Sequence, residues 1–232
     1  HCFGRVDRNV HHGPLVLHEG HLAVLDQQGE GDLVQVVGHE RAALEAAGLK
    51  LRKDCQFHWE NRDYETFDDF LGTFTSAKRK KARRDRRRVA KQGIRFRRLR
   101  GNEMDTESWS RVYSLIARTF MLRGSLPYFN QAFFEGLSDR LPDNVLVITA
   151  EQADLTIAAA VFYESDTTLY GRYWGSDGHY DALHFETCYY QGIDFCIRNR
   201  IGRFEPGTQG EHKISRGFVP ETTWSAHWLA RP

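Results

Sequence analysis

The sequence predicts an α+β fold, close to an α/β arrangement, in which helices flank a mixed, mostly antiparallel sheet. Three observations support this prediction. From residue 93 onward the segments follow the order β-α-α-β-β-β-α-β-loop-β. Residues 155–163 are almost wholly apolar, which is typical of a strand covered on both faces. Residues 107–121 and 182–200 repeat apolar side chains at helical spacing.

The first part of the chain contains several short elements. Alternating apolar residues predict strands at 15–17, 21–25, 33–37 and 55–59, and residues 39–48 read as a helix that ends at a glycine. Thr66 precedes Asp68 and Asp69, so we expect Thr66 to cap a helix whose first turn is acidic. A further helix at 77–92 follows Ser76 and is closed by Gly93.

The second part of the chain alternates longer strands and helices. Strands are expected at 94–99, 144–151, 155–164, 167–175, 203–204 and 222–229, the last with Trp224, Ala226 and Trp228 on one face. Helices are expected at 107–121, 131–140 and 182–200. The aromatic side chains of the first of these helices repeat at core spacing, so we interpret them as core residues.

Length and composition limit the class of protein. With 232 residues and 41% hydrophobic content, the chain can bury the core of one large domain or two small ones. We find no apolar run near the ~18 residues of a membrane span and no signal peptide. The four cysteines show no CxxC spacing and favour a reducing, cytoplasmic compartment. Six histidines before residue 40 could hold a metal, but their loose spacing favours an ordinary surface, so no metal is predicted.

Charge is distributed very unevenly along the chain. Residues 78–100 contain 14 basic residues and a single acid, so this stretch carries +13 while the rest of the chain carries −12. The helix at 77–92 has almost no apolar stripe, and we expect it to bury no face in a core. Its charge predicts a polyanion-binding surface. The residues concerned are Lys78, Arg79, Lys80, Lys81, Arg83, Arg84 and Arg87. The alternative is a solvated helix, or one that docks on the acidic body of the same chain.

The stretch 205–218 concentrates chemically reactive side chains. It contains three glycines, two carboxylates, an imidazole, an ammonium, a guanidinium and an amide between an apolar helix and an aromatic-rich strand. Loops on a rigid scaffold are common positions for binding and catalysis. We therefore predict a functional loop, with a well hydrogen-bonded connector as the alternative.

Seven motifs give the chain a resemblance to a known family. It resembles the FemAB-like (peptidoglycan biosynthesis/recognition) family of the GNAT acyltransferase superfamily, over residues 55–229. The motifs are Cys55-Gln56-Phe57-His58-Trp59-Glu60-Asn61, Phe67-Asp68-Asp69-Phe70-Leu71, Lys78-Arg79-Lys80-Lys81, Leu169-Tyr170-Gly171-Arg172-Tyr173-Trp174-Gly175, His184-Phe185-Glu186-x-Cys188-Tyr189-Tyr190-Gln191, Gly207-x-Gln209-Gly210-Glu211-His212-Lys213-x-x-Arg216-Gly217-Phe218 and Ser225-Ala226-His227-Trp228.

The resemblance implies a domain organisation and an activity. Residues 1–60 would be a β-rich segment left from a first GNAT-like half, 61–92 a helical connector, and 93–232 a GNAT-like acyltransferase domain. The implied activity is acetyl or aminoacyl transfer to an amine, in a bacterial, cytoplasmic enzyme acting on a small molecule or a cell-wall precursor. The donor would be an acyl-CoA or an aminoacyl-tRNA. The segment 175–181 departs from the pyrophosphate loop of acetyl-CoA enzymes, because it lacks the basic lead residue and carries two aspartates.

We assign roles on this basis. Glu211 or His212 would act as base, and Lys213 would bind an anion or stabilise an oxyanion. The expected substrate-binding residues are Tyr170, Arg172, Glu186, Gly207, Gln209, Gly210, Arg216 and Gly217. The alternatives without a catalytic role are a structural ion pair between Glu186 and Arg172, and a strand histidine at His227 whose hydrogen bonds are satisfied within the fold. The competing function is a non-catalytic module that binds tRNA, lipid headgroups or a cell-wall precursor through the basic helix.

Overall fold

The computed structural model describes residues 15–18, 21–24, 38–207 and 210–228. The strand predicted at 33–37 and the loop residue Gln209 lie outside these ranges. The chain divides into two compact units, residues 1–56 with 220–232 and residues 57–219. Every residue of the site described below that the structure covers belongs to the second unit.

The first unit contains short elements close to those predicted. Strands β1 (Leu15–His18) and β2 (His21–Val24) pair antiparallel, and helix α1 spans Gly38–Ala46. Strand β3 (Lys50–Glu60) starts in this unit, and β9 (Val219–His227) ends in it. The guanidinium of Arg41 lies 4.3 Å from the ring centroid of Trp224. Trp228 follows the end of β9 and is exposed.

The second unit carries most of a seven-stranded sheet of order β4-β5-β6-β7-β8-β3-β9. Its remaining strands are β4 (Arg95–Arg100), β5 (Val145–Gln152), β6 (Leu155–Glu164), β7 (Thr168–Ser176) and β8 (Arg203–Glu205). Strands β4 to β7 pair antiparallel, whereas β7 and β8 run parallel. This confirms the predicted α+β class and the central position of the apolar strand 155–164.

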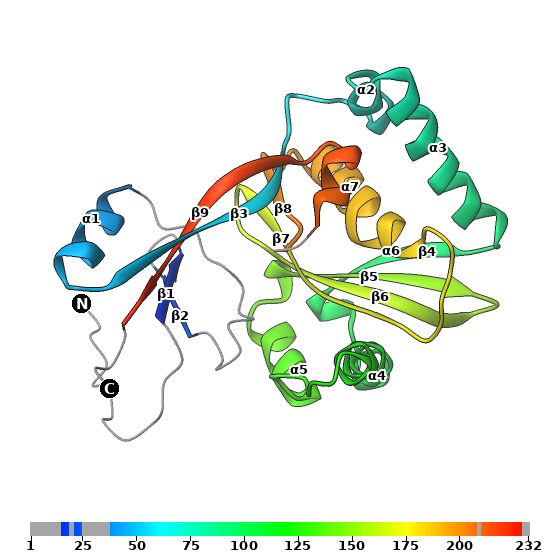
Figure 1. Ribbon diagram of the computed structural model, residues 1–232. Helices are drawn as coiled ribbons and strands as arrows, with labels where there is room; N and C mark the ends of the chain where they lie inside the picture. Colours follow the sequence, from blue (N-terminus) through cyan, green and yellow to red (C-terminus); the bar gives the residue numbers. More distant parts are fainter. Residues whose placement is uncertain (1–14, 19–20, 25–37, 208–209, 229–232) are drawn as a thin grey trace. The chain divides into compact units, whose positions relative to one another are not determined.

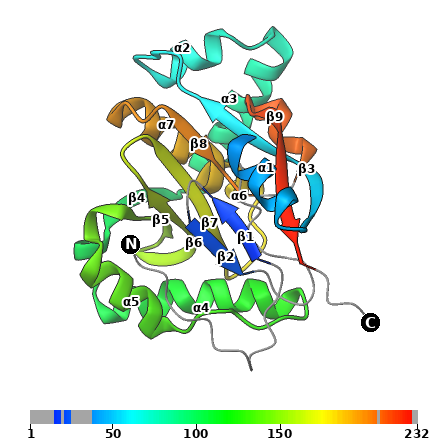
Figure 2. The same ribbon diagram turned by 90° about the vertical axis from the view of Figure 1, so that its left-hand side faces the viewer.

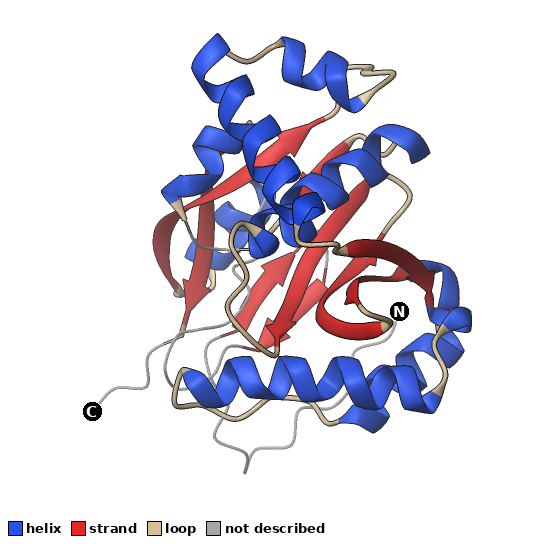
Figure 3. Cartoon of the chain, turned by 90° about the vertical axis from the view of Figure 1, so that its right-hand side faces the viewer, coloured by secondary structure: helices blue, strands red, loops and turns tan. Residues whose placement is uncertain are grey.

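Helices cover both faces of this sheet (Figures 1 and 3). On one face lie α4 (Thr106–Leu122) and α5 (Gln131–Arg140), and on the other lie α7 (Gln191–Asn199) and α3 (Ser76–Lys91). Alternate residues of β5 pack into the two hydrophobic clusters, one on each face of the sheet. Val147 packs with the α4–α5 side, and Ile148 packs with the α7 side. The period of two along a strand therefore separates the two hydrophobic clusters.

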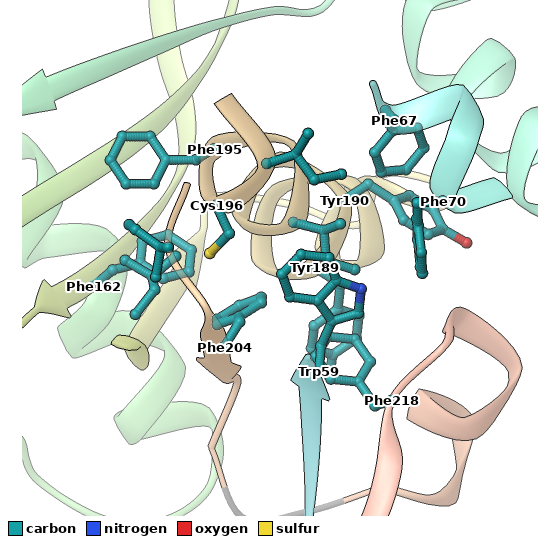
Figure 4. Packing of buried hydrophobic residues seen from close by; sticks show 14 of the residues in the cluster. Trp59, Phe67, Phe70, Phe162, Tyr189, Tyr190, Phe195, Cys196, Phe204 and Phe218 are labelled. Atoms are coloured by element: carbon teal, nitrogen blue, oxygen red, sulfur yellow. The ribbon is translucent and has the colours of Figure 1, made fainter. Parts of the chain in front are cut away.

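The larger core cluster is rich in aromatic rings (Figure 4). Trp59 at the end of β3 packs edge-on against Phe70 of α2 (Phe67–Gly72), with 5.8 Å between ring centroids. The ring centroids of Phe204 and Phe218 lie 5.6 Å apart in the same cluster. This core connects β3, α2, α7, β8 and Phe218, which follows η4, so it fixes the elements that carry the reactive side chains.

Helix α3 departs from its prediction. Thr66 caps α2 in a capping box with Asp69 as expected, but α3 is capped by Thr75 rather than Ser76. The prediction that α3 buries no face was wrong, because Ala82, Asp85 and Val89 are all buried. Two small apolar residues and one acid, spaced three and four residues apart, suffice to form a packed stripe.

The predicted helix at 182–200 is interrupted in its hydrogen bonding. It consists of α6 (Leu183–Phe185), a π-helical segment η3 (Glu186–Tyr190) and α7. Single π-helical turns inside α-helices are frequent at functional sites. Here the π turn widens the helix where Glu186, Tyr189 and Tyr190 point into the protein, and all three are buried.

Candidate functional site

The site is built around a short 3-10 helix, η4 (Glu211–Arg216), which follows β8. Gly210 and Gly217 bound η4 with φ values of 114° and 92°, and Gly207 has φ 91°. A Cβ on Gly217 would lie 2.6 Å from the Phe70 ring. Glycine is therefore required at position 217 for the backbone conformation and for close packing on α2.

Lys213 is the most unusual residue of η4. It is 1% exposed, and its Nζ donates a hydrogen bond to the carbonyl oxygen of Gly207 at 2.5 Å. No described carboxylate lies within ion-pair distance, and two of the three ammonium donors have no partner among the described residues. Burial lowers the pKa of Lys213 to about 8. A buried cation without a counter-ion is costly, and its environment favours either loss of the proton or an incoming anion.

His212 precedes Lys213 and faces Tyr189 of the π segment. Its Nε2 lies 2.9 Å from the hydroxyl oxygen of Tyr189. Partial burial and the nearby charges of Arg216, Lys213 and Lys81 lower its pKa below the usual 6.5. The imidazole is therefore neutral at pH 7 and able to accept a proton.

A second histidine, His184, lies behind this pair. Its ring centroid is 5.4 Å from that of Tyr189 and 6.5 Å from that of His212. Burial, followed by the charges of His212, Arg216 and Lys213, lowers the pKa of His184 to about 4. Two neutral imidazoles and a phenol thus form the polar wall beside Lys213.

Arg216 ends η4 and fixes its position. It is 2% exposed, its guanidinium carbon lies 3.4 Å from the centroid of Phe185, and Nη1 donates to the carbonyl oxygen of His212 at 2.8 Å. Its Nη2 lies 3.5 Å from Oδ2 of Asp85, the buried acid of α3. The guanidinium therefore connects α3, α6 and η4. Direct contact of Arg216 with a substrate stays a prediction.

Glu186 opens the π segment and is 3% exposed. Its Oε1 accepts hydrogen bonds from Arg86 Nε at 3.2 Å and from Gln191 Nε2 at 2.8 Å, whereas Oε2 has no partner among the described residues. Burial raises the pKa of Glu186. The carboxylate considered as a partner of Arg172 is thus held by Arg86 of α3.

The strands β7 and β8 open beside the site. Their parallel pairing covers only Thr168 to Tyr170 against Arg203 to Glu205. Beyond this point β8 turns away through Pro206 toward η4. Tyr170 and Arg172 lie on β7 at this opening, with the Arg172 guanidinium 5.2 Å from the Tyr170 ring. These two predicted residues therefore lie at the point where the chain leaves the sheet for the loop.

The basic helix α3 combines an anchored face and a free face. Arg83, Arg86 and Arg88 form ion pairs with Asp68, Glu186 and Asp181 at 2.9, 3.2 and 2.9 Å. This supports docking on acidic residues for that face. The exposed bases without an ion pair to a described residue are Lys78, Lys80, Lys81, Arg84, Arg87 and Lys91. Arg79 reaches only the carbonyl oxygen of Gly72, at 3.4 Å.

The turn at 176–181 does not form a phosphate cradle. Asp177 pairs with Arg111 at 2.7 Å and accepts a hydrogen bond from the Tyr180 hydroxyl, and Asp181 pairs with Arg88. Arg111 and Arg88, the cations that this turn contacts, are thus already paired with its carboxylates. A pyrophosphate would have to displace them, so the residues present do not fit the phosphates of coenzyme A in the usual acetyl-CoA position.

Sequence reasoning found some site residues and missed others. It found Lys213, His212 and Arg216 because they crowd one polar loop. It assigned no role to His184, Tyr189 or Asp85, which were read as parts of an apolar helix and a basic one. Glu211 is exposed at the start of η4, and its role as base stays a prediction. Among the described residues no group of three or more His, Cys, Asp or Glu could hold a metal, and no helix is long and apolar enough to cross a membrane.

Comparison with known proteins identifies the family. A family model described as peptidoglycan biosynthesis/recognition, FemAB-like, matches residues 25–232. No match was found among curated proteins. Similar solved structures include L-PGS from Bacillus licheniformis, with a TM-score of 0.59 and 11% identity over 87% of this chain and 68% of that one. FemX has a TM-score of 0.59 and 12% identity, over 88% and 73%.

A third similar structure is the C-terminal domain of a candidate lysylphosphatidylglycerol synthetase from Agrobacterium fabrum. Its TM-score is 0.61 at 11% identity, over 86% of this chain and 67% of that one. Identities this low show a shared fold alone. The family model covers nearly the whole chain, and its range includes every element of the site. The chain belongs to the FemAB-like family of peptidoglycan biosynthesis and recognition.

Proposed function

We propose that this protein is an N-acyltransferase that moves an aminoacyl or acyl group onto an amine of a peptidoglycan precursor. The observation that carries the proposal is Lys213, a buried ammonium with no carboxylate partner among the described residues and with two unused donors. Such a group is well placed to stabilise negative charge that develops during acyl transfer. The neutral imidazole of His212, next to Lys213 in the same helix, supports the proposal because it can accept a proton.

The proposed reaction balances as follows. The acceptor amine forms a bond to the carbonyl carbon of an ester donor, and negative charge collects on the carbonyl oxygen beside Lys213. His212, or Glu211 through water, accepts a proton from the amine nitrogen. The carbon–oxygen bond to the donor then breaks, and the proton passes to the leaving oxygen. Tyr170 and Arg172 would hold the acceptor at the opening between β7 and β8.

The surface of α3 favours a polyanionic donor such as aminoacyl-tRNA over an acyl-CoA. Asp85 of α3 lies 3.5 Å from Arg216 of η4, and the charge of Lys81 contributes to lowering the pKa of His212, so the basic helix adjoins the site. Lys80, Arg84 and Arg87 are spaced four and three residues apart, which aligns them along one side of the helix. The turn at 176–181, by contrast, presents carboxylates where the phosphates of coenzyme A would be expected. We therefore infer that the donor's phosphates are held by α3.

The experiment is a transfer assay read by mass spectrometry. Purified protein is incubated with a pentapeptide-bearing peptidoglycan precursor and, in separate reactions, aminoacyl-tRNA or an acyl-CoA. The proposal expects the precursor mass to increase by one aminoacyl residue with the tRNA donor. Salt-dependent RNA binding without any product, across several acceptor amines, would contradict an enzyme and favour the non-catalytic binding module. Product formed only with acyl-CoA would contradict the role given to α3.

A further inference from the structure

The connection between α4 and α5, which lies away from the basic helix (Figure 2), carries a group of exposed apolar side chains. Among the described residues, eleven large apolar side chains are exposed, and six of them fall between residues 121 and 133. These six, called here the apolar tip, are Met121, Leu122, Leu126, Tyr128, Phe129 and Phe133. Leu122 is 74% exposed and Leu126 is 78% exposed. Concentration of large apolar groups on one exposed turn marks an interaction surface.

The apolar tip is ordered by its own contacts. Tyr128 packs edge-on against Phe120 with 5.4 Å between ring centroids, and Phe129 stacks on Phe133 at 4.0 Å. The backbone amide of Ser125 donates to the carbonyl oxygen of Phe120 at 3.1 Å. The loop thus folds back on the end of α4 and displays its apolar side chains outward.

The charges around the apolar tip have one sign. Between Glu107 and Glu135 the chain contains no acidic residue but three arginines. Arg111 pairs with Asp177, whereas Arg118 and Arg123 make no ion pair with a described residue. Unpaired arginines beside exposed leucine, phenylalanine and tyrosine match the two layers of an anionic bilayer surface, where cations meet headgroups and apolar groups enter the acyl boundary. A protein partner would not require this combination.

Helix α4, whose C-terminal end carries the apolar tip, packs on β7 at Gly175, and the neighbouring Trp174 of β7 contacts His184 with 5.2 Å between ring centroids. The charge of Arg123 contributes to lowering the pKa of His184, which stands beside Tyr189 and His212. We propose that the apolar tip, with Arg118 and Arg123, docks this protein reversibly on membranes that contain anionic lipid.

Vesicle co-sedimentation tests this proposal. The probes are vesicles of phosphatidylcholine alone and of phosphatidylcholine with 30% phosphatidylglycerol, at low and high salt. We expect binding to the anionic vesicles, at least tenfold weaker in Leu122→Ser/Leu126→Ser/Phe129→Ser. Arg118→Gln/Arg123→Gln should weaken binding to anionic vesicles about tenfold and reduce the difference between the two compositions. Leu155→Ser, at an exposed leucine that begins β6, is the matched control and should bind like the parent protein.

The outcomes separate the proposal from its competitors. All variants change exposed residues, and circular dichroism verifies that each is folded. Absence of parent binding to either vesicle, or equal binding by the triple serine variant, overturns the proposal. A dimer in analytical ultracentrifugation that the triple serine variant abolishes, without vesicle binding, would instead make the tip a protein interface. Neither donor nor acceptor is present, so failure here is distinct from failure of the transfer reaction.

Discussion

The Nε2 atom of His212 lies 2.9 Å from the hydroxyl oxygen of Tyr189, which joins the loop helix η4 to the π segment η3. Tyr189 lies within the π turn and is buried. If the phenol donates to Nε2, the imidazole proton lies on Nδ1, and if it accepts from Nε2–H, Nδ1 is the free acceptor, so this hydrogen bond couples the phenol to the tautomer of His212. Proton transfer in the proposed reaction should therefore depend on both residues.

The first prediction concerns the pH dependence of transfer. His212 must be neutral to accept a proton, and its pKa is lowered below 6.5, so kcat/KM should rise with pH through a group that titrates below 6.5. Lys213 must be protonated, and its pKa is about 8, so the rate should fall above pH 8. His212→Gln should lower kcat/KM about 100-fold and should abolish the rise of kcat/KM with pH on the acidic side of the profile. If Glu211→Gln loses that limb instead, Glu211 is the base.

The second prediction separates the two faces of α3. The triple variant Lys80→Gln/Arg84→Gln/Arg87→Gln changes only exposed bases. Its free energy of unfolding should therefore differ from that of the parent by less than about 0.5 kcal/mol. RNA affinity should fall, and the salt slope measured by fluorescence anisotropy should drop by about 2, the value for three lost phosphate contacts on a single strand.

The matched variant is Arg86→Gln on the anchored face of the same helix. It leaves the buried carboxylate of Glu186 without its cation and should cost about 3 kcal/mol in urea unfolding. Equal stability of Arg86→Gln and the triple variant would contradict the division of α3 into an anchored and a free face.

The third prediction is acid destabilisation through His184. In the folded protein its pKa is about 4, against about 6.5 in the unfolded chain. Between these values the unfolded state binds a proton that the folded state does not, so the free energy of unfolding falls as pH drops from 6.5 to 4. The expected loss is roughly 3 kcal/mol. In urea unfolding at each pH, His184→Phe should flatten this dependence, whereas the exposed-site control His179→Gln should leave it unchanged.

The fourth prediction compares two glycines. A Cβ on Gly175 would lie 2.1 Å from the backbone carbonyl carbon of Leu115, while one on Gly136 of α5 would meet nothing within 4 Å. Gly175→Ala should lower the free energy of unfolding by about 3 kcal/mol or prevent folding, because backbone atoms must shift. Gly136→Ala should stabilise by up to about 1 kcal/mol through helix propensity. Thermal unfolding checks both, and a Gly175→Ala protein as stable as its parent would contradict the close packing of β7 on α4.

Local periodicity predicted the elements well because it is a property of neighbouring residues. The helix predicted at 131–140 coincides with α5, and the apolar strand 155–164 is central in the sheet. The buried face of α3 was missed because the partner of Asp85 is Arg216, far along the chain. The π segment was missed because a π turn leaves no periodic signal in five residues. His184 and Tyr189 consequently joined the site only once the structure placed them beside His212.

The site residues divide by how they could be found. Gly210 and Gly217 and the polar side chains between them form one continuous loop, so composition alone indicated them. The burial of Lys213 could not be predicted, since no hydrophobic pattern surrounds it in the sequence. It follows from the packing of η4 against α3 and α6 through Arg216.

The most direct test is Lys213→Met, measured for transfer rate and for stability on the same sample. The change keeps an unbranched side chain one atom shorter than lysine and removes a buried charge that has no carboxylate partner among the described residues. The account predicts that kcat falls at least about 100-fold. The free energy of unfolding at pH 7 should stay within about 1 kcal/mol of the parent value or increase. A variant that retains the full transfer rate, or that loses activity only because it unfolds, would contradict the central role of Lys213.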